Sequence, residues 1–466
     1  MSNLLNKPKA AIPEDSAGKY ESLNLKENPF PLSPYVNKNN LDIRYNGSIY
    51  ESKIREKEFN QVVEGFLKVP QTDPNHIRLG YIQDNSYVGR GNGKSAFAVN
   101  LVSKINKEFC IDLSEGVNKC FGLHIAPEPS GRTKTFDSFV DSVFQAILEL
   151  DLIKYSLASL RLEALMNIGK EFDLKEFNSD NQIIESLNSK EWFSDKKIVV
   201  SEITRFIYKN GGLNKISSDF PLYEDLNRHY NFHIVTQEKF ENYYFKTLRK
   251  GKERLKFVFN DLILFFKASG FNGGFIIVDD FERIPDFQSE KLRQQFALEL
   301  RTNFFDGIYE NAKVGFLNLI LVMHAGTPRL VGKAWDVSGL ERRSPLSEDS
   351  VNDKHFISFE KLNLDHAKLL ITKYVNEYLL DSEKNKFPFS DDAIALISEK
   401  CELNAASMLE KCHVLIEEAV KESKSVVDKK FVEDYFGKTK GSMEEEAKHV
   451  STEETTDLFE KSKNDD

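Results

Sequence analysis

The chain has 466 residues, of which 40% are hydrophobic and 29% charged, with 36 phenylalanines and a formal net charge of −10. This composition is too apolar for a disordered protein, and the length predicts a folded chain of two or three domains. The negative charge argues against a surface coated for nonspecific nucleic-acid binding, although it leaves room for a local basic patch.

The sequence shows no sign of secretion or membrane insertion. The amino terminus holds no apolar run of signal-peptide length, and stretches such as GFLNLILVM at 315–323 are too short to span a bilayer. We therefore expect a cytoplasmic protein without a membrane partner. The four cysteines lack the spacing of a disulfide framework or a zinc site, so we expect them to be reduced and structural. They are Cys110, Cys120, Cys401 and Cys412.

The first part of the chain leads from an extended segment into a strand, a glycine-rich turn and a helix. Residues 1–45 are rich in Pro, Asn, Lys and Ser and predict an extended leader. A helical spacing of apolar residues follows at about 50–68, and HIRLGYIQ at 76–83 alternates like a short strand. After GRGNGKS at 89–95, the residues from Lys94 onward have the apolar period of a helix.

Strands and helices continue to alternate before helices take over. An apolar run that ends in two acids at 273–280, and a similar run at 316–323, are typical of central parallel strands buried on both faces. This alternation predicts an α/β fold with a parallel sheet covered on both sides. Further elements are a strand at 120–126, helices from about 135 and at 289–303, a mostly helical region at 151–270, helices from 364 and an acidic polar tail from 438.

The glycine-rich turn has the composition of a phosphate cradle. A helix that begins at such a turn presents unpaired N–H groups and the positive end of its dipole. In the pattern G-x-x-x-x-G-K-[ST] the lysine reaches the terminal phosphates and the hydroxyl binds Mg²⁺. Val88 stands where the first glycine belongs, and Gly89 follows one place later. The predicted phosphate-binding residues are Gly89, Arg90, Gly91, Asn92, Gly93, Lys94, Ser95 and Ala96.

A second motif supports the first. Asp279 and Asp280 end the apolar run FIIVDD, which is where a P-loop enzyme places the carboxylate that holds the Mg²⁺ shell. Two matches of the right kind, in the right order, favour a phosphate cradle over a plain glycine-rich turn. We therefore predict ATP and Mg²⁺ as cofactors, with Ser95 and Asp279 at the metal.

With these motifs the sequence resembles the AAA+ ATPases, especially the branch of origin-recognition ATPases, transposition regulators and STAND ATPases. Besides the loop and the acidic strand, Arg55 and Glu58 resemble an Arg-x-x-Glu motif in the preceding helix. The resemblance implies a P-loop NTPase core at 46–150 and 271–362, a mostly helical insertion at 151–270 and a helical lid at 363–437, flanked by the leader at 1–45 and the tail at 438–466.

The resemblance also implies catalytic roles, each with a plainer alternative. Asp280 or Glu282 would orient water, or else cap the following helix. His324 or Thr327 would sense the γ-phosphate, or His324 is a core histidine. Arg342 and Arg343 would act on a neighbouring subunit's nucleotide, or form surface ion pairs. Because Asp280 is one methylene shorter than the family's usual glutamate, we expect slow turnover. The family's lid arginine is missing, since the turn reads Leu403, Asn404, Ala405, Ala406.

Three functions stay open from the sequence. The leading one is a slowly hydrolysing, homo-oligomeric regulatory ATPase that acts on a partner protein through 151–270, in a context that the resemblance places in prokaryotic defence or mobile-element biology. The second is a DNA-loaded ATPase that uses the basic run at 246–257 together with Arg329 and Lys333. The third is a scaffold that binds nucleotide without hydrolysing it.

Overall fold

The computed structural model describes residues 18–69, 73, 76–84, 90–115, 118–168, 176–226, 234–312, 315–346, 354–381 and 386–438. The chain divides into two compact units. The sheet unit consists of Glu56–Arg90 and Phe97–Phe359, and the helical unit consists of the residues up to Arg55, Gly91–Ala96 and those from Glu360 onward. Helix α2 is continuous from Lys94 to Lys107, so its first turn groups with the helical unit and the remainder with the sheet unit.

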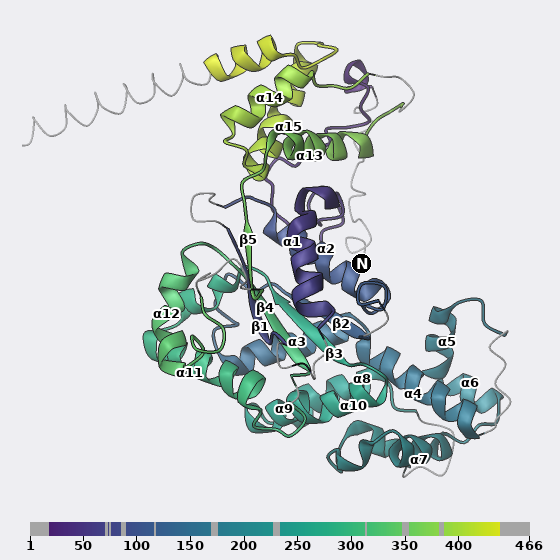
Figure 1. Ribbon diagram of the computed structural model, residues 1–466. Helices are drawn as coiled ribbons and strands as arrows, with labels where there is room; N and C mark the ends of the chain where they lie inside the picture. The colour runs from purple at the N-terminus through teal and green to yellow at the C-terminus, as the bar shows by residue number, and fades with distance from the viewer. Residues whose placement is uncertain are drawn as a thin grey trace, which may run out of the picture. The chain divides into compact units, whose positions relative to one another are not determined.

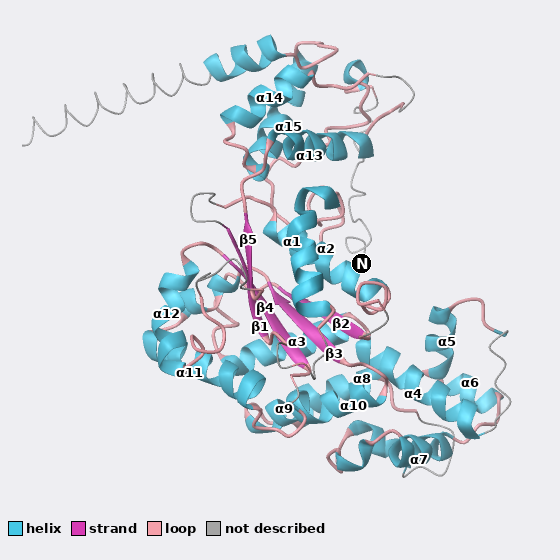
Figure 2. Cartoon of the chain, viewed as in Figure 1, coloured by secondary structure: helices cyan, strands magenta, loops and turns pink. Residues whose placement is uncertain are grey.

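The sheet unit is built on five parallel strands in the order β2-β3-β4-β1-β5, drawn in magenta in Figure 2. Every residue of β3 and β4 is buried, as the uninterrupted apolar runs predicted. The predicted α/β fold with a parallel sheet is therefore confirmed. The strands are β1 (Leu79–Asp84), β2 (Cys120–Ile125), β3 (Gly273–Val278), β4 (Leu317–Met323) and β5 (Phe356–Phe359).

Figure 1 labels the helices of the sheet unit. They are α1 (Glu56–Val62), α2 (Lys94–Lys107), α3 (Phe136–Glu149), α4 (Leu152–Ile168), α5 (Asp180–Leu187), α6 (Lys190–Asp195), α7 (Val200–Asn210), α8 (Gln237–Asn242), α9 (Lys252–Lys256), α10 (Leu262–Ala268), α11 (Glu290–Leu300) and α12 (Thr327–Ser338). Sequence periodicity did not reveal α12, because Pro328 and Gly332 interrupt its pattern, although proline is well accommodated in the first turn.

The region 151–270 holds helices α4 to α10, and its apolar side chains belong to the same core as the strands. Phe121 of β2, for example, packs edge-on against Phe266 of α10. Within this region the buried Arg161 donates to the carbonyls of Leu187 and Val235 and pairs with Asp225. One arginine thus ties three separate segments of the region together.

The helical unit contains α13 (Leu364–Glu377), α14 (Asp391–Lys400) and α15 (Ala405–Lys421), together with the described part of the leader. From Gly18 onward the leader is packed rather than loose, because Leu23, Leu25 and Phe30 are buried in the same core as the three helices. The sparse apolar residues of this segment gave no periodic pattern from which that packing could be predicted.

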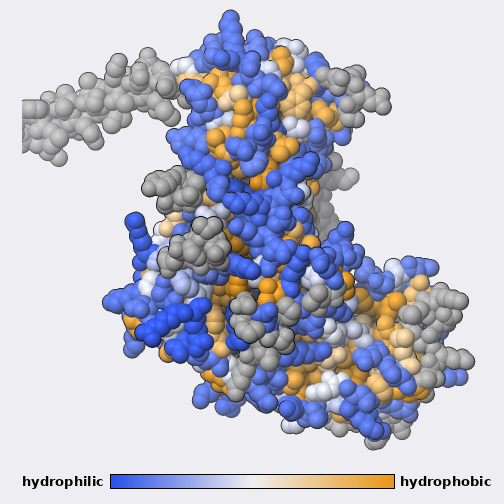
Figure 3. All heavy atoms as spheres, in the orientation of Figure 1, coloured by the Kyte–Doolittle hydropathy of each residue, from blue (hydrophilic) through white to orange (hydrophobic). Residues whose placement is uncertain are grey.

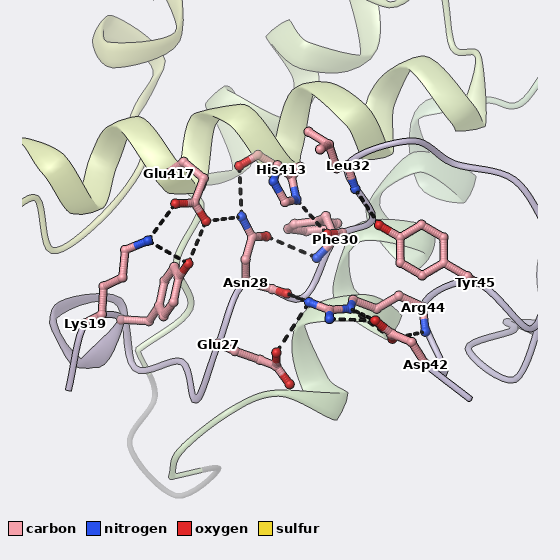
Figure 4. Close-up of polar contacts among 11 residues, drawn as sticks. Lys19, Glu27, Asn28, Phe30, Leu32, Asp42, Arg44, Tyr45, His413 and Glu417 are labelled. Carbon is pink, nitrogen blue, oxygen red and sulfur yellow. Dashed lines mark hydrogen bonds and ion pairs between the residues drawn. The ribbon is translucent and has the colours of Figure 1, made fainter. Parts of the chain in front are cut away.

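Polar contacts fix the leader to α15 (Figure 4). Glu417 accepts hydrogen bonds from Tyr20, Asn28 and Lys19 at 2.6, 2.9 and 2.9 Å, and the His413 ring lies 2.7 Å from the carbonyl of Phe30. Burial acts to raise the pKa of Glu417, but these hydrogen bonds and the charge of Lys19 outweigh it and lower the pKa to about 2. The carboxylate is thus an ionised anchor for the leader.

None of the described helices is both long and apolar enough to cross a bilayer, and hydrophilic residues predominate on the face drawn in Figure 3. All four cysteines are free and buried.

Candidate functional site

The glycine-rich loop is described from Arg90 onward, so Gly89 lies outside the described residues. Gly91 and Gly93 have φ of +98° and +84°, a region that glycine adopts without steric cost. A side chain on Gly91 would lie 2.7 Å from Asn404 Oδ1 and 2.8 Å from Ala406 Cβ, whereas one on Gly93 would meet no atom within 4 Å. Both glycines are therefore needed for the turn, and Gly91 is needed for close packing as well.

The start of α15 holds this loop through its backbone. The N–H of Ala406 donates to the carbonyl of Gly91 at 2.9 Å. The Asn404 side chain caps α15 by accepting from the N–H of Ser407 at 3.1 Å. The turn Leu403–Ala406 thus contacts the loop by a main-chain hydrogen bond.

Arg55 fixes the loop from another direction. Its guanidinium is buried and donates to the carbonyl of Asn92 at 3.3 Å and to that of Glu360 at 3.0 Å. A buried guanidinium that joins two carbonyls holds the backbone at both places. Lys94 and Ser95, the first residues of α2, directly follow this fixed turn. The loop is therefore shaped by the protein itself, with glycine φ angles, a helix start and an arginine each contributing.

The second part of the candidate site lies at the carboxyl edge of the sheet. We call His124, Asp279, Asp280, Glu282 and His324 the edge cluster, because each lies at or just beyond the end of a strand. Asp279 follows β3, and its N–H donates to the carbonyl of Ile125 at the end of β2. Its Oδ1 accepts from the N–H of Asp280 at 3.0 Å, and its Oδ2 lies 3.8 Å from His124 Nε2.

The two candidate water-orienting acids differ in their surroundings. Asp280 has a φ of +46° and its carboxylate pairs with Arg283 at 2.5 Å. The side chain of Glu282 is only 12% exposed. Its Oε2 accepts from the N–H of His324 at 3.3 Å, and its Oε1 lies 4.0 Å from Arg90. Burial, with the negative charge of Asp280 beside it, raises the pKa of Glu282.

Of the two candidate γ-phosphate sensors, His324 directly follows β4 and Thr327 is the first residue of α12. His324 uses its ring Nδ1 to accept from the N–H of Gly326 at 3.1 Å, and its carbonyl accepts from the N–H of Thr327 at 2.9 Å. The hydroxyl of Thr327 is buried and has no hydrogen-bond partner among the described residues. The ring of His324 is therefore oriented by its own turn, which leaves Nε2 as its remaining polar atom.

The two candidate arginines are also distinguished. Arg343 is half-exposed, pairs with Asp306 at 2.9 Å and lies over the ring of Phe305. Arg342 is exposed, and no described residue forms an ion pair with it. Arg343 therefore forms a surface ion pair, which was the alternative considered from the sequence. The guanidinium of Arg342 is available to another molecule.

The basic run at 246–257 divides in the same way. Arg254 is buried, pairs with Asp141 at 2.8 Å and stacks over Tyr244. Lys256 donates to Ser217 at 2.7 Å. Lys246, Arg249, Lys250 and Lys252 are exposed, and Lys250 also lies 3.8 Å from the carboxylate of Asp141. Elsewhere Lys333 pairs with Glu290, whereas Arg329 is exposed.

Sequence reasoning did not single out His124. The available signal was a polar residue near the end of an otherwise apolar strand, CFGLHIA. Its importance depends on Asp279, which lies far along the chain and becomes its neighbour only through the β2–β3 pairing. Among the described residues no group of three or more His, Cys, Asp and Glu could hold a metal unaided.

No protein-family model matches the sequence, and no curated protein matches it either. Similar solved structures include an ORC2 protein from Aeropyrum pernix in its ADP form, at 8% identity and a TM-score of 0.40, over 86% of this chain and 69% of that one. A Walker-type ATPase of Pyrococcus abyssi has 12% identity and a TM-score of 0.38, over 91% and 80%. Cdc6p of Pyrobaculum aerophilum has 9% identity and a TM-score of 0.36, over 83% and 68%. These values do not define a fold, which here follows from the order of the strands.

Proposed function

We propose that this protein is an ATPase of the AAA+ type that binds ATP with Mg²⁺, hydrolyses it slowly and acts as an oligomeric regulatory switch on a partner protein. One observation carries the proposal. The glycine-rich loop joins the end of β1 to the start of α2, and Asp279 follows β3 of the same parallel sheet. Parallel strands end at one edge, where nucleotides bind in open α/β sheets.

Each residue then has a stated task. The N–H groups of the loop and of the first turn of α2 cradle the phosphates. The ammonium of Lys94 neutralises charge on the terminal phosphates, and Ser95 and Asp279 hold Mg²⁺, which supplies further neutralisation of the phosphate oxygens when it is bound. Positioning and charge are what phosphoryl transfer requires, so this set suffices to bind ATP and to polarise it.

Slow turnover follows from the way in which the carboxyl groups of Asp280 and Glu282 are held. A carboxylate that orients water must be free and well placed. Asp280 is held by Arg283, and Glu282 is two positions further along the chain, with its pKa raised by burial. Neither acid is ideally presented, and a small misplacement costs on the order of 100-fold in rate. This supports a switch rather than a fast motor.

Oligomerisation is supported by Arg342. An exposed guanidinium without an ion pair among the described residues can reach the phosphates of a neighbouring copy, whereas Arg343 is committed to Asp306. An arginine supplied from another subunit stabilises transition-state charge. We further propose that region 151–270 provides the surface for the regulated protein partner, in a prokaryotic defence or mobile-element setting.

The alternative is a DNA-loaded ATPase, and the exposed side chains of Lys246, Arg249, Lys250 and Lys252 favour it. Four exposed cations in seven positions can contact successive phosphates. Burial of Arg254 against Asp141 removes one charge from that surface.

The test is phosphate release from ATP and Mg²⁺, with and without duplex DNA. We expect slow release that Lys94→Ala abolishes. Arg342→Ala should lower release while nucleotide binding persists, and Arg343→Ala is the matched control with little effect. Mixing the Arg342→Ala protein with the Lys94→Ala protein should restore phosphate release if each nucleotide site is shared between two subunits. DNA stimulation lost in Lys250→Ala/Lys252→Ala would favour the alternative, and nucleotide binding without release would favour a scaffold.

A further inference from the structure

A buried histidine in the edge cluster lacks hydrogen-bond partners. His124 lies on β2, where it is paired in register with Ile277 of β3, and its side chain is 7% exposed. Both ring nitrogens are buried, and neither has a hydrogen-bond partner among the described residues. A buried polar group left without a partner costs about 1–3 kcal/mol. Such a group calls for a reason beyond packing.

The other described histidines of the sheet unit each have one ring nitrogen in a hydrogen bond, although Nδ1 of His76 is also buried without a partner among the described residues. His355 Nε2 lies 3.0 Å from the carbonyl of Pro345, His76 Nε2 lies 2.9 Å from Asn318 Oδ1, and His324 Nδ1 accepts from Gly326. Among the described histidines of this unit, His124 is the one with neither ring nitrogen in a hydrogen bond, and it lies beside Asp279.

Of the two carboxylate oxygens of Asp279, the residue beside His124, one accepts a hydrogen bond and the other faces the histidine ring. Asp279 Oδ1 is held by the N–H of Asp280 at 3.0 Å, whereas Oδ2 faces His124 Nε2 across 3.8 Å. That separation is longer than a hydrogen bond, and a relative movement of about 1 Å would close it. Both side chains are only 7% exposed, so little bulk water competes for the contact.

We propose, on the basis of the proposed ATP and Mg²⁺ site, that His124 is a positioning residue of that site. It donates Nε2–H to Asp279 Oδ2 and fixes the plane of the carboxylate, so that the remaining lone pairs of Asp279 face the Mg²⁺ shell. Residues that hydrogen-bond a metal-binding carboxylate typically change metal affinity by 10- to 100-fold when they are replaced. The loop residues that bind phosphate are not involved, so nucleotide binding without metal stays unchanged.

The test measures metal binding rather than turnover. Mn²⁺ serves as the probe, because free Mn²⁺ can be quantified by its paramagnetic resonance signal in the presence of a non-hydrolysable ATP analogue. The full chain is compared with His124→Leu, which lacks a donor, and His124→Gln, whose amide N–H takes the place of Nε2–H. His355→Gln is the matched control, and Asp279→Asn defines the loss of the carboxylate. Binding of a fluorescent ATP analogue in EDTA is measured for each.

The expected result is about 10- to 100-fold weaker Mn²⁺ binding in His124→Leu, recovery in His124→Gln, and EDTA binding within about 2-fold of the parent in both. If His124→Leu does not fold, His124→Asn, whose amide is too short to reach Oδ2, must show the loss that His124→Gln does not. Unchanged Mn²⁺ affinity in these variants, while Asp279→Asn loses it, would overturn the role of His124 alone. No metal binding by the parent complex would overturn the proposed function and this inference together.

Discussion

The glycine-rich loop and the edge cluster are built in opposite ways. The loop is held by a hydrogen bond from the N–H of Ala406 to the carbonyl of Gly91. The buried guanidinium of Arg55 holds it as well, by donating to the carbonyl of Asn92. In the edge cluster the side chains of His124, Asp279 and Glu282 are buried, yet His124 lies 3.8 Å from Asp279, and Glu282 has contacts of 3.3 Å with the N–H of His324 and 4.0 Å with Arg90. The comparison teaches that the glycine-rich loop takes its shape from folding, whereas the acidic edge still has hydrogen-bonding capacity for a ligand.

The largest expected effect comes from Gly91→Ala. Its Cβ would lie within 2.8 Å of α15 atoms at a φ of +98°, so both strain and overlap arise. Left-handed strain costs about 1–3 kcal/mol and overpacking a similar amount. We expect loss of nucleotide binding and a lower urea midpoint. Gly93→Ala has strain without overlap and should lose roughly half as much stability, and equal losses would refute the close packing.

Arg55→Ala tests the fixed loop next. Removal of the guanidinium takes a hydrogen bond from each of the carbonyls of Asn92 and Glu360. A hydrogen bond from a charged group contributes about 1.5–3 kcal/mol to stability. We expect nucleotide binding in EDTA to weaken about 10-fold or more. Arg44→Ala, which removes an arginine from the leader instead, should leave binding unchanged. Equal binding in all three proteins would show that the loop does not need the guanidinium.

The pH dependence of ATP turnover tests the acids of the edge cluster. Because burial raises the pKa of Glu282 above its ordinary value of 4.5, the carboxylate form is reached only at higher pH than for an ordinary glutamate. If Glu282 orients water, turnover falls as pH drops through that raised pKa, and Glu282→Gln removes this limb of the profile. Arg283→Ala removes the ion pair between Arg283 and Asp280 and should raise turnover a few-fold if Asp280 has that task instead. Loss of the pH limb in Glu282→Gln would assign the water-orienting role to Glu282, and faster turnover in Arg283→Ala would assign it to Asp280.

The smallest effect concerns the leader. Glu417 has a folded pKa of about 2, below its ordinary 4.5, so its contribution to leader packing is present above pH 4.5 and is lost as pH falls from 4.5 toward 2. Limited proteolysis of residues 18–30 should become faster across that range. Glu417→Gln should raise cleavage at neutral pH and flatten the pH dependence, and cleavage independent of pH in the parent would contradict the anchor.

Sequence predicted the parts of the site that have a local signature. The apolar runs before Asp279 and before His324 defined β3 and β4, and the glycines with Lys94 and Ser95 marked the start of α2. Partnerships between distant residues could not be predicted, because the pairing of His124 with Asp279 and the support of Gly91 by Ala406 exist only after folding. The binding of Asp280 by Arg283 was local but ambiguous, since an exposed pair three residues apart has no fixed geometry in sequence.

The central claim is that the loop and the acidic edge form one ATP and Mg²⁺ site. The most direct measurement is the affinity for a fluorescent ATP analogue in the parent, Lys94→Ala and Asp279→Asn proteins, each with Mg²⁺ and with EDTA. The account predicts that Mg²⁺ tightens binding in the parent, that Asp279→Asn binds as the parent does in EDTA but gains nothing from Mg²⁺, and that Lys94→Ala binds weakly in both. Equal Mg²⁺ dependence in the parent and Asp279→Asn would contradict it.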